Sequence, residues 1–517
     1  MASVQDDSPK PRLDQLPFEI RSIIVKHLAD QREHEARGID APYIYRMSTP
    51  CARGLRALPA TPRGLYGVGQ EFLYRTIILY KLARYQYLLR TVINSPNLAQ
   101  HIRSLVVFEC SDIPDGTDPV DTTKPPRRKR RKRSNPHRKP KPRNRSSVTP
   151  LLQLRPLSEP MVRLWAAMPG IRHTSGLISE QHEVNTRDAA LGLLDLIVNL
   201  PSLEHFRYIG LLYPSKRPRL YHYKTILSDN STPFQEVFTS AISTLGHGAI
   251  GDIGLFKNLK DIDISGLNTH YWRGFLNSIL LAPNVHTFRL TRLPYDDHKI
   301  DLTHLRYEDH QLHRDEWPGT LSSIRNLYID TPFLHPETIA VMLKALQALE
   351  VLHFKFSFPG RVDFNVEHLH SAIHSHRKTL KDLRMNKPRS SHRRFRRPIT
   401  FIPHPTWSEY PELVILHVPH TLLWASEANS SNHIWRLPPR LEALGITALE
   451  YLTTAELLSI IDLLSTLPDY RHQFPNLRDV TIPALPERRP QSALEERLEP
   501  HGIGLHNFYH SYPGSLP

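Results

Sequence analysis

The chain has 517 residues, of which 40% are hydrophobic and 23% are charged. This apolar content excludes a wholly disordered protein, and the length predicts two to four domains or one long repeat array. The formal net charge is +15, but residues 127–145 alone carry twelve Lys or Arg and no acid, which leaves the rest near +3. A folded surface that coats nucleic acid is therefore not implied.

Targeting and redox signals are few. The two cysteines, Cys51 and Cys110, are too few for a disulfide framework or a cysteine-based zinc site. The best apolar run, residues 189–200, is interrupted by Asp195 and predicts a buried helix rather than a membrane span. Residues 1–11 contain no apolar signal region and are expected to be disordered. We therefore expect a soluble intracellular protein that does not enter a membrane.

The first predicted element is a helix over residues 13–29. Pro17 suits the first helical turn, where a missing N–H costs nothing, and Glu19 lies where the helix dipole favours an anion. The apolar residues that follow share one stripe of the helix: Ile20, Ile23, Ile24 and Leu28. By periodicity alone, this pattern indicates an ordinary helix that faces a core.

The residue identities in this helix resemble the opening of an F-box. The matching pattern is Leu16-Pro17-x-Glu19-Ile20-x-x-x-Ile24-x-x-x-Leu28. Residues 64–79 resemble the closing helix and the Leu-Tyr-Arg exit of fungal F-box proteins, and residues 30–63 between the two halves look partly like an inserted loop. We therefore expect an F-box-like helical region with an inserted loop over residues 12–80.

The F-box resemblance implies binding to the Skp-type adaptor of a cullin–RING ubiquitin ligase. The implied adaptor-binding residues are Leu16, Pro17, Glu19, Ile20, Ile24 and Leu28. Two or three helices of fewer than about 70 residues bury too little surface to be stable alone, so they need the rest of the chain or a partner. Anchors at i, i+4 and i+8 also suit a helix that docks in a groove.

A connecting helix and a first strand are expected over residues 81–110, before a low-complexity insert at 111–150. The insert is acidic at 112–121 and then strongly basic, and it has too few apolar residues to offset the entropy of ordering, so we expect it to be a disordered linker. Its basic run resembles a nuclear-localisation signal: Arg127, Arg128, Lys129, Arg130, Arg131, Lys132 and Arg133. We expect the protein in nucleus and cytoplasm, with the nucleus favoured; contact with nucleic acid is the alternative reading of this run.

The pattern apolar-x-x-apolar-x-apolar recurs ten times on strand-like runs. Its copies are Ile102/Leu105/Val107, Leu203/Phe206/Tyr208, Leu259/Ile262/Ile264, Val285/Phe288/Leu290, Ile324/Leu327/Ile329, Leu349/Leu352/Phe354, Leu380/Leu383/Met385, Leu413/Leu416/Val418, Leu441/Leu444/Ile446 and Leu477/Val480/Ile482. Helical patterns lie between many copies, for example at 336–349 and 453–467.

This alternation of strands and helices resembles a degenerate leucine-rich-repeat array over residues 151–485, followed by a C-terminal tail at 486–517. The predicted fold class is α/β: a small all-α F-box region and then an irregular leucine-rich-repeat-like solenoid. A doubly wound α/β sheet is the alternative. Parallel strands of a solenoid line one concave wall, which suits recognition of another protein.

An F-box followed by leucine-rich repeats is the architecture of a substrate receptor of a Skp–cullin–F-box ubiquitin ligase. The resemblance implies that the repeats select a protein substrate, whose identity the sequence does not reveal, and that the chemistry occurs on other subunits. The rival interpretation is a solenoid scaffold whose F-box-like helix is a structural cap and whose basic linker contacts nucleic acid.

No catalytic residue, metal site or cofactor is expected, so the sequence favours a non-enzyme. Gly246-x-Gly248-x-x-Gly251 has the spacing of a dinucleotide site, but here a helical pattern precedes it and a strand follows, which is the reverse of the required order. His370 and His374 are spaced to share a metal, but no third ligand is evident. With His368 and His376 they are interpreted as the polar face of a solvated helix.

A basic loop at residues 386–398 follows the strand pattern at 380–385. Loops that leave the C-terminal ends of parallel strands gather along one rim, and guanidinium groups suit carboxylate and phosphate oxygens. We therefore hypothesise contact with an acidic or phosphorylated substrate segment through Arg389, Arg393, Arg394, Arg396 and Arg397. A solvated surface loop or a second import signal is the alternative.

Overall fold

The protein is an α/β solenoid built on one parallel sheet. The computed structural model describes residues 23, 26–27, 71–72, 74–79, 85–110, 192–211, 258–265, 284–291, 323–330, 336–355, 366–386, 407–419, 423, 437–447, 454–483 and 488–508. Within these ranges a single sheet of 12 strands runs in the order β1 to β12, so each strand pairs with the next one along the chain. A doubly wound sheet reverses its strand order at a switch point, so this sequential order excludes that alternative for the described strands.

All eleven strand pairs are parallel. The strands are β1 Thr76–Leu79, β2 Ser104–Cys110, β3 His205–Leu211, β4 Asp261–Ser265, β5 Thr287–Thr291, β6 Asn326–Asp330, β7 Val351–Lys355, β8 Asp382–Asn386, β9 Ile415–Pro419, β10 Ala443–Thr447, β11 Asp479–Pro483 and β12 Gly504–Phe508.

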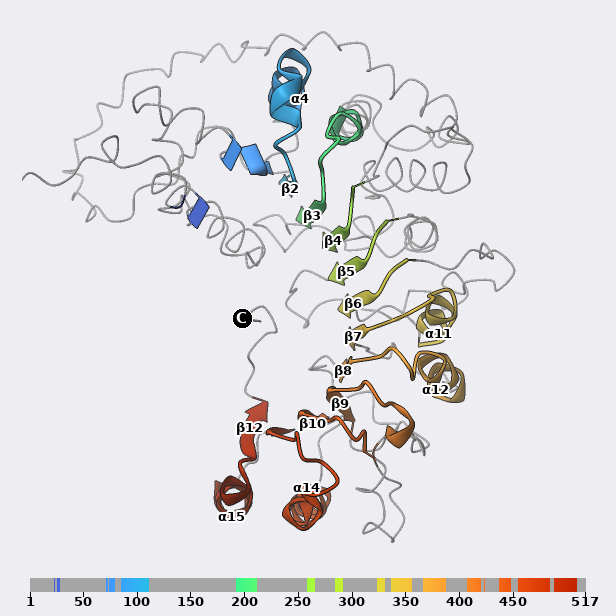
Figure 1. Cartoon of the computed structure of the whole chain (residues 1–517), viewed down its shortest axis with the longest axis vertical. Helices are drawn as coiled ribbons and strands as arrows, with labels where there is room; N and C mark the ends of the chain where they lie inside the picture. The colour runs from blue at the N-terminus through green and yellow to red at the C-terminus, as the bar shows by residue number, and fades with distance from the viewer. Residues whose placement is uncertain are drawn as a thin grey trace, which may run out of the picture.

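Helices connect several of these strands and cover one side of the sheet. Among the described residues, the labelled α-helices are α4 Tyr85–Asn94, α5 Pro96–Ala99, α11 Pro336–Lys344, α12 Val366–His374, α14 Thr454–Leu464 and α15 Arg488–Leu498. The 3-10 helices are η10 Trp407–Glu409, η13 Leu467–Tyr470 and η14 Glu499–His501, and residues 192–198 are also helical. Figure 1 shows the strands along the inner side of an arc, with α11, α12, α14 and α15 on its outer side. The opposite side of the sheet therefore faces the hollow of the arc.

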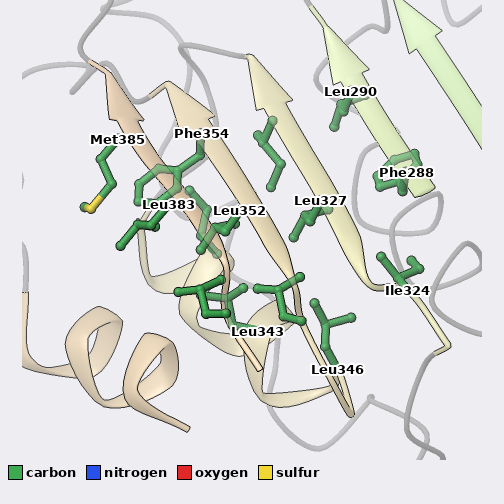
Figure 2. Packing of buried hydrophobic residues seen from close by; sticks show 14 of the residues in the cluster. Phe288, Leu290, Ile324, Leu327, Leu343, Leu346, Leu352, Phe354, Leu383 and Met385 are labelled. Carbon is green, nitrogen blue, oxygen red and sulfur yellow. The ribbon is translucent and has the colours of Figure 1, made fainter. Parts of the chain in front are cut away.

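The ten apolar triplets of the sequence form the core between the sheet and the helices. Every one of their residues is buried, with at most 3% of its surface exposed. Because side chains alternate across a strand, the second and third members of each triplet point to the same side of the sheet, toward the helices. In Figure 2, Leu352, Phe354, Leu383 and Met385 pack in this layer beside Leu343 of α11. A fully buried leucine stabilises the fold by about 1.5–3 kcal/mol, so stacking the repeats supplies most of the stability.

A ladder of backbone hydrogen bonds joins the repeats just before their strands begin. The residue after the first member of each triplet donates its N–H to the carbonyl of its counterpart in the preceding repeat, for example Lys260 to Glu204 at 2.8 Å and Glu350 to Arg325 at 2.7 Å. These bonds extend the regular stacking beyond the short strands and fix the register of neighbouring repeats.

The sheet reaches beyond the residues over which the sequence predicts repeats. Strands β1 and β2 precede residue 151, and β12 follows residue 485. The stretch 64–79 was expected to hold a closing helix and its Leu-Tyr-Arg exit; residues 71–72 and 74–75 are helical, and Thr76–Leu79, directly after that exit, form β1. The first strand therefore lies inside the region 12–80 that was expected to be helical, and the C-terminal segment continues the same sheet.

Two helical expectations have different outcomes. Residues 192–198 form a buried helix, as the apolar run predicts, and the Asp195 side chain within it accepts a hydrogen bond from Asn199 at 3.0 Å. The interpretation of the four α12-region histidines as a solvated face is correct for exposed His368. It is wrong for His376, which is only 4% exposed, and for His370 and His374, which are half-buried and each have one buried ring nitrogen. The His376 ring is buried because it bridges two repeats: its Nε2 lies 2.8 Å from the Leu343 carbonyl.

Candidate functional site

The side of the sheet that faces the hollow carries a continuous row of polar side chains. The residue between the second and third members of each triplet points away from the helices, and the parallel register aligns these residues across β3–β9. We call them the polar row: Arg207, Asp263, Arg289, Tyr328, His353, Arg384 and His417.

An ion pair occupies the β3–β4 end of the polar row. Nε of Arg207 lies 3.1 Å from Oδ2 of Asp263, and the two side chains are only 16% and 21% exposed. Burial raises the pKa of Asp263, while the charges of Arg207 and Arg289 oppose that rise. Arg207 and Asp263 are therefore shielded from solvent and paired with each other.

The centre of the polar row is a stack of side chains. The guanidinium carbon of Arg289 lies 4.3 Å from the ring centroid of Tyr328, within the range of a cation–π contact. The Tyr328 ring meets the His353 ring edge-on, with 4.8 Å between the centroids. Arg289 is the one exposed residue of the row.

The β7–β8 part of the polar row converges on one carboxylate, Asp382, which begins β8. His353 Nε2 lies 2.9 Å from its Oδ2, and Arg384 donates to both carboxylate oxygens, at 3.0 Å and 3.1 Å. Burial raises the pKa of Asp382, but the hydrogen bonds and charges of His353 and Arg384 outweigh burial and lower it below 3.8. This carboxylate is therefore ionised at neutral pH, and both of its oxygens have a partner in His353 or Arg384.

His417 ends the polar row beside Arg384. Burial lowers the pKa of His417 to about 4, and the charge of Arg384 acts in the same direction, whereas Asp382 opposes it. Its ring is therefore neutral at physiological pH. The buried Gly445 on β10 is its neighbour in the register and leaves room for the ring.

Neutral polar groups flank the centre of the row on the same face. Thr287 and Thr291 lie two residues before and after Arg289, so all three point to the hollow. Asn326 Nδ2 donates to Thr287 Oγ1 at 3.3 Å, and the hydroxyls of Ser265 and Thr291 lie 2.5 Å apart. The β4–β6 part of the face thus offers hydroxyl and amide groups around an exposed guanidinium, with the carboxylate of Asp330 beside Thr291 on β6.

The face is not equally open along its length. Near the N-terminal end, Val106 of β2 and Ile209 of β3 point to the hollow but are only 3% and 1% exposed. At β5, by contrast, Arg289 is exposed. The accessible part of this face is therefore centred on β5 and β6.

The site residues predicted from sequence lie outside the described residues. This applies to all six adaptor-binding residues at 16–28, to the basic run 127–133 and to the basic loop residues 389–397. Close to the first set, Ile23, Lys26 and His27 are helical and exposed, and Ile23 is 63% exposed. The structure therefore describes part of the predicted N-terminal helix but none of the named contacts.

Sequence reasoning missed the polar row. The sequence does contain a signal for it. In seven consecutive repeats, the residue between the second and third members of the triplet is charged, aromatic or His. Apolar residues dominate a pattern search, and the intervening positions attract notice only once the register aligns them.

The charged and aromatic groups of the row form ion pairs and stacks with one another and with Asp382. Within the described ranges, no group of three or more His, Cys, Asp or Glu side chains could hold a metal ion. Among the same residues, no helix combines the length and apolarity that crossing a lipid bilayer requires.

No protein-family model and no curated protein sequence matches the chain.

Proposed function

We propose that the chain is the substrate-recognition subunit of a Skp–cullin–F-box ubiquitin ligase. Its N-terminal helix would bind the adaptor, and its solenoid would bind a target protein. Target binding is supported by the parallel sheet with the polar row on its open side, because a preorganised concave face suits a macromolecular partner. Adaptor binding is supported by the residues at 16–28 that resemble an F-box.

An exposed apolar residue supports a partner for the N-terminal helix. Ile23 belongs to the apolar stripe of that helix and is 63% exposed. A large aliphatic side chain left in water on a stripe of this kind suits a helix whose apolar side docks in the groove of another protein.

The experiment is co-purification of a Skp-type adaptor with the full chain. Ile20→Asp with Ile24→Asp should abolish binding, because burying a charge in an apolar contact costs several kcal/mol. Lys26→Glu is the matched control, since Lys26 is an exposed residue of the same helix. Failure of the wild-type chain to bind any such adaptor would reject the receptor function.

The basic run at 127–133 favours a second candidate, a solenoid scaffold that contacts nucleic acid. Tight, salt-sensitive binding to DNA or RNA that is lost when the seven basic residues become Gln would support the scaffold. If the same change instead moves a tagged protein from the nucleus to the cytoplasm, the run acts as an import signal. We propose the import signal, and hence nuclear enrichment, together with the receptor function.

A further inference from the structure

Arg289 is presented to the hollow of the arc in a fixed position. Its guanidinium carbon lies 4.3 Å from the Tyr328 ring centroid, and the Tyr328 ring is itself held edge-on by His353 at 4.8 Å. Stacking a planar guanidinium on an aromatic ring leaves its N–H edge free to donate hydrogen bonds. An exposed arginine normally loses much rotamer freedom on binding, and this stack removes part of that cost beforehand.

Arg289 is also the polar-row arginine that forms no salt bridge with a carboxylate among the described residues. Arg207 pairs with Asp263, and Arg384 pairs with Asp382 through two hydrogen bonds. No salt bridge joins Arg289 to another residue in the part of the chain that the structure describes, and Asp263 acts on it only at longer range. The row and Asp382 together hold three arginines and two aspartates, so Arg289 is the arginine of this set that neither aspartate pairs with.

The groups around Arg289 suit the backbone of a bound segment. Thr287 and Thr291 flank it along β5, and Asn326 lies beside Thr287 on β6. Hydroxyl and amide groups both donate and accept hydrogen bonds, as the N–H and C=O groups of an extended peptide require. We define the Arg289 patch as Arg289, Tyr328, Thr287, Thr291 and Asn326.

We propose that the Arg289 patch binds an Asp or Glu side chain of an extended segment in a partner protein. The bound carboxylate accepts hydrogen bonds from the guanidinium edge, which is the geometry that carboxylates and arginine form most readily. The single positive charge of Arg289 complements one carboxylate, whereas a dianionic phosphate would leave a negative excess beside Asp263 and Asp330 on the neighbouring strands. This inference rests on the proposed function, because it specifies the substrate chemistry that the solenoid reads.

The test selects random peptides displayed on phage against the full chain and then measures the affinity of a selected synthetic peptide. The selected sequences should share an acidic residue. Arg289→Ala should lower the affinity for the peptide by about tenfold or more, as the loss of a charge-assisted hydrogen bond predicts. Replacing the shared Asp or Glu of the peptide by its amide should cause a similar loss, with little further effect of Arg289→Ala on that amide peptide.

Matched variants separate recognition from folding. Arg325→Ala removes the same charge one strand away, at the strand-entry edge of the sheet, where Arg325 pairs with Glu350 and is 56% exposed. It should leave peptide affinity unchanged. Tyr328→Phe keeps the stacking ring and should bind like the wild type, whereas Tyr328→Leu should weaken binding. All variants should unfold at the wild-type temperature within a few degrees.

Several results would overturn the proposal. These are failure to enrich any peptide, selected peptides without a shared acid, or affinity that is indifferent to Arg289→Ala. Tighter binding of a phosphoserine version that also depends on Arg289 would reassign the site to phosphate. Failure of the receptor function is a separate result: adaptor co-purification would be lost while Arg289-dependent peptide binding remained.

Discussion

The ring of His417 lies against the Cα of Gly445, its parallel neighbour on the next strand. A Cβ added to Gly445 would lie closer than 3.0 Å to Cδ2, Cγ and Nε2 of the His417 ring. Both residues point to the hollow of the arc, so the absent side chain of one strand makes room for the ring of the other. Gly445 is therefore required by packing against a neighbour.

The first prediction concerns this packing. Gly445→Ala should destabilise the protein by about 1–3 kcal/mol, because the ring must leave its position in a closely packed surface. Most of this cost should disappear in the presence of His417→Ala, which a double-mutant cycle in denaturant measures as a coupling free energy. Gly504→Ala is the control, since the nearest atom to its added Cβ would be the far end of His506 at 3.2 Å. Equal costs for Gly445→Ala with and without the His417 ring would contradict this account.

The second prediction concerns Asp382, the shared acceptor of His353 and Arg384. Asp382→Asn should cost about 2 kcal/mol, because it leaves two half-buried donors without their ionised partner. Glu412→Gln is the matched control: its partner Arg440 lies 2.6 Å away, but the two side chains are 41% and 58% exposed, so the cost should stay below about 1 kcal/mol. Equilibrium unfolding of both variants decides the matter, and similar costs would show that the Asp382 network is no stronger than a surface ion pair.

The third prediction concerns His376, which bridges two repeats. Its Nε2–H donates to the Leu343 carbonyl at 2.8 Å, and the Leu349 N–H points to Nδ1 at 3.5 Å. His376→Phe keeps an aromatic ring but leaves the Leu349 N–H without its acceptor and removes one of the two hydrogen bonds to the Leu343 carbonyl, which keeps the Leu346 N–H at 3.1 Å, so it should cost about 2 kcal/mol. His368→Phe, at an exposed position of α12, the helix that precedes the His376 turn, should change the unfolding free energy by less than about 0.5 kcal/mol. A neutral His376→Phe would refute the bridging role.

The repeating core was predictable because burial repeats with a fixed spacing. In each of the ten triplets, two residues of a strand and one of the preceding turn must face the helices, and this demand leaves an apolar residue at each position. The first strand, β1, shows where prediction from apolar spacing fails. Tyr74, Ile77 and Leu79 stand in register with the triplet of β2, but the same residues also continue a helical pattern. Periodicity alone does not separate the two structures over so short a run.

The last strand and the polar row escaped prediction for different reasons. Strand β12 is the end of the sheet and pairs only with β11 among the described strands, so it has less need of apolar residues; Gly502 and Asn507 occupy two of its triplet positions. The polar row depends on which residues lie side by side across strands. Arg289 and Tyr328 are 39 positions apart, and only the register of β5 with β6 brings them together.

The fourth prediction is a loss of stability in mild acid. Burial lowers the pKa of His370 and of His417 from 6.5 to about 4, and burial also lowers the pKa of His376, although its hydrogen bond to Leu343 opposes this. Below pH 6.5 the unfolded chain therefore binds protons that the folded chain does not. The stability contribution is fully present above pH 6.5 and declines as the pH falls from 6.5 toward about 4, by up to about 3 kcal/mol for a shift of this size.

Thermal unfolding measured between about pH 8 and about pH 4.5 tests the acid effect. The midpoint should be level above pH 6.5 and fall below it, and His417→Gln should make the fall shallower because Gln does not titrate. Asp382 does not interfere, since its lowered pKa moves its own effect below pH 3.8. Asp263 acts in the opposite direction, because burial raises its pKa and protonation then favours the folded chain. A midpoint that stays level to pH 4.5 in the wild type, or an unchanged slope in His417→Gln, would show that these rings titrate in the folded protein as they do in the unfolded chain.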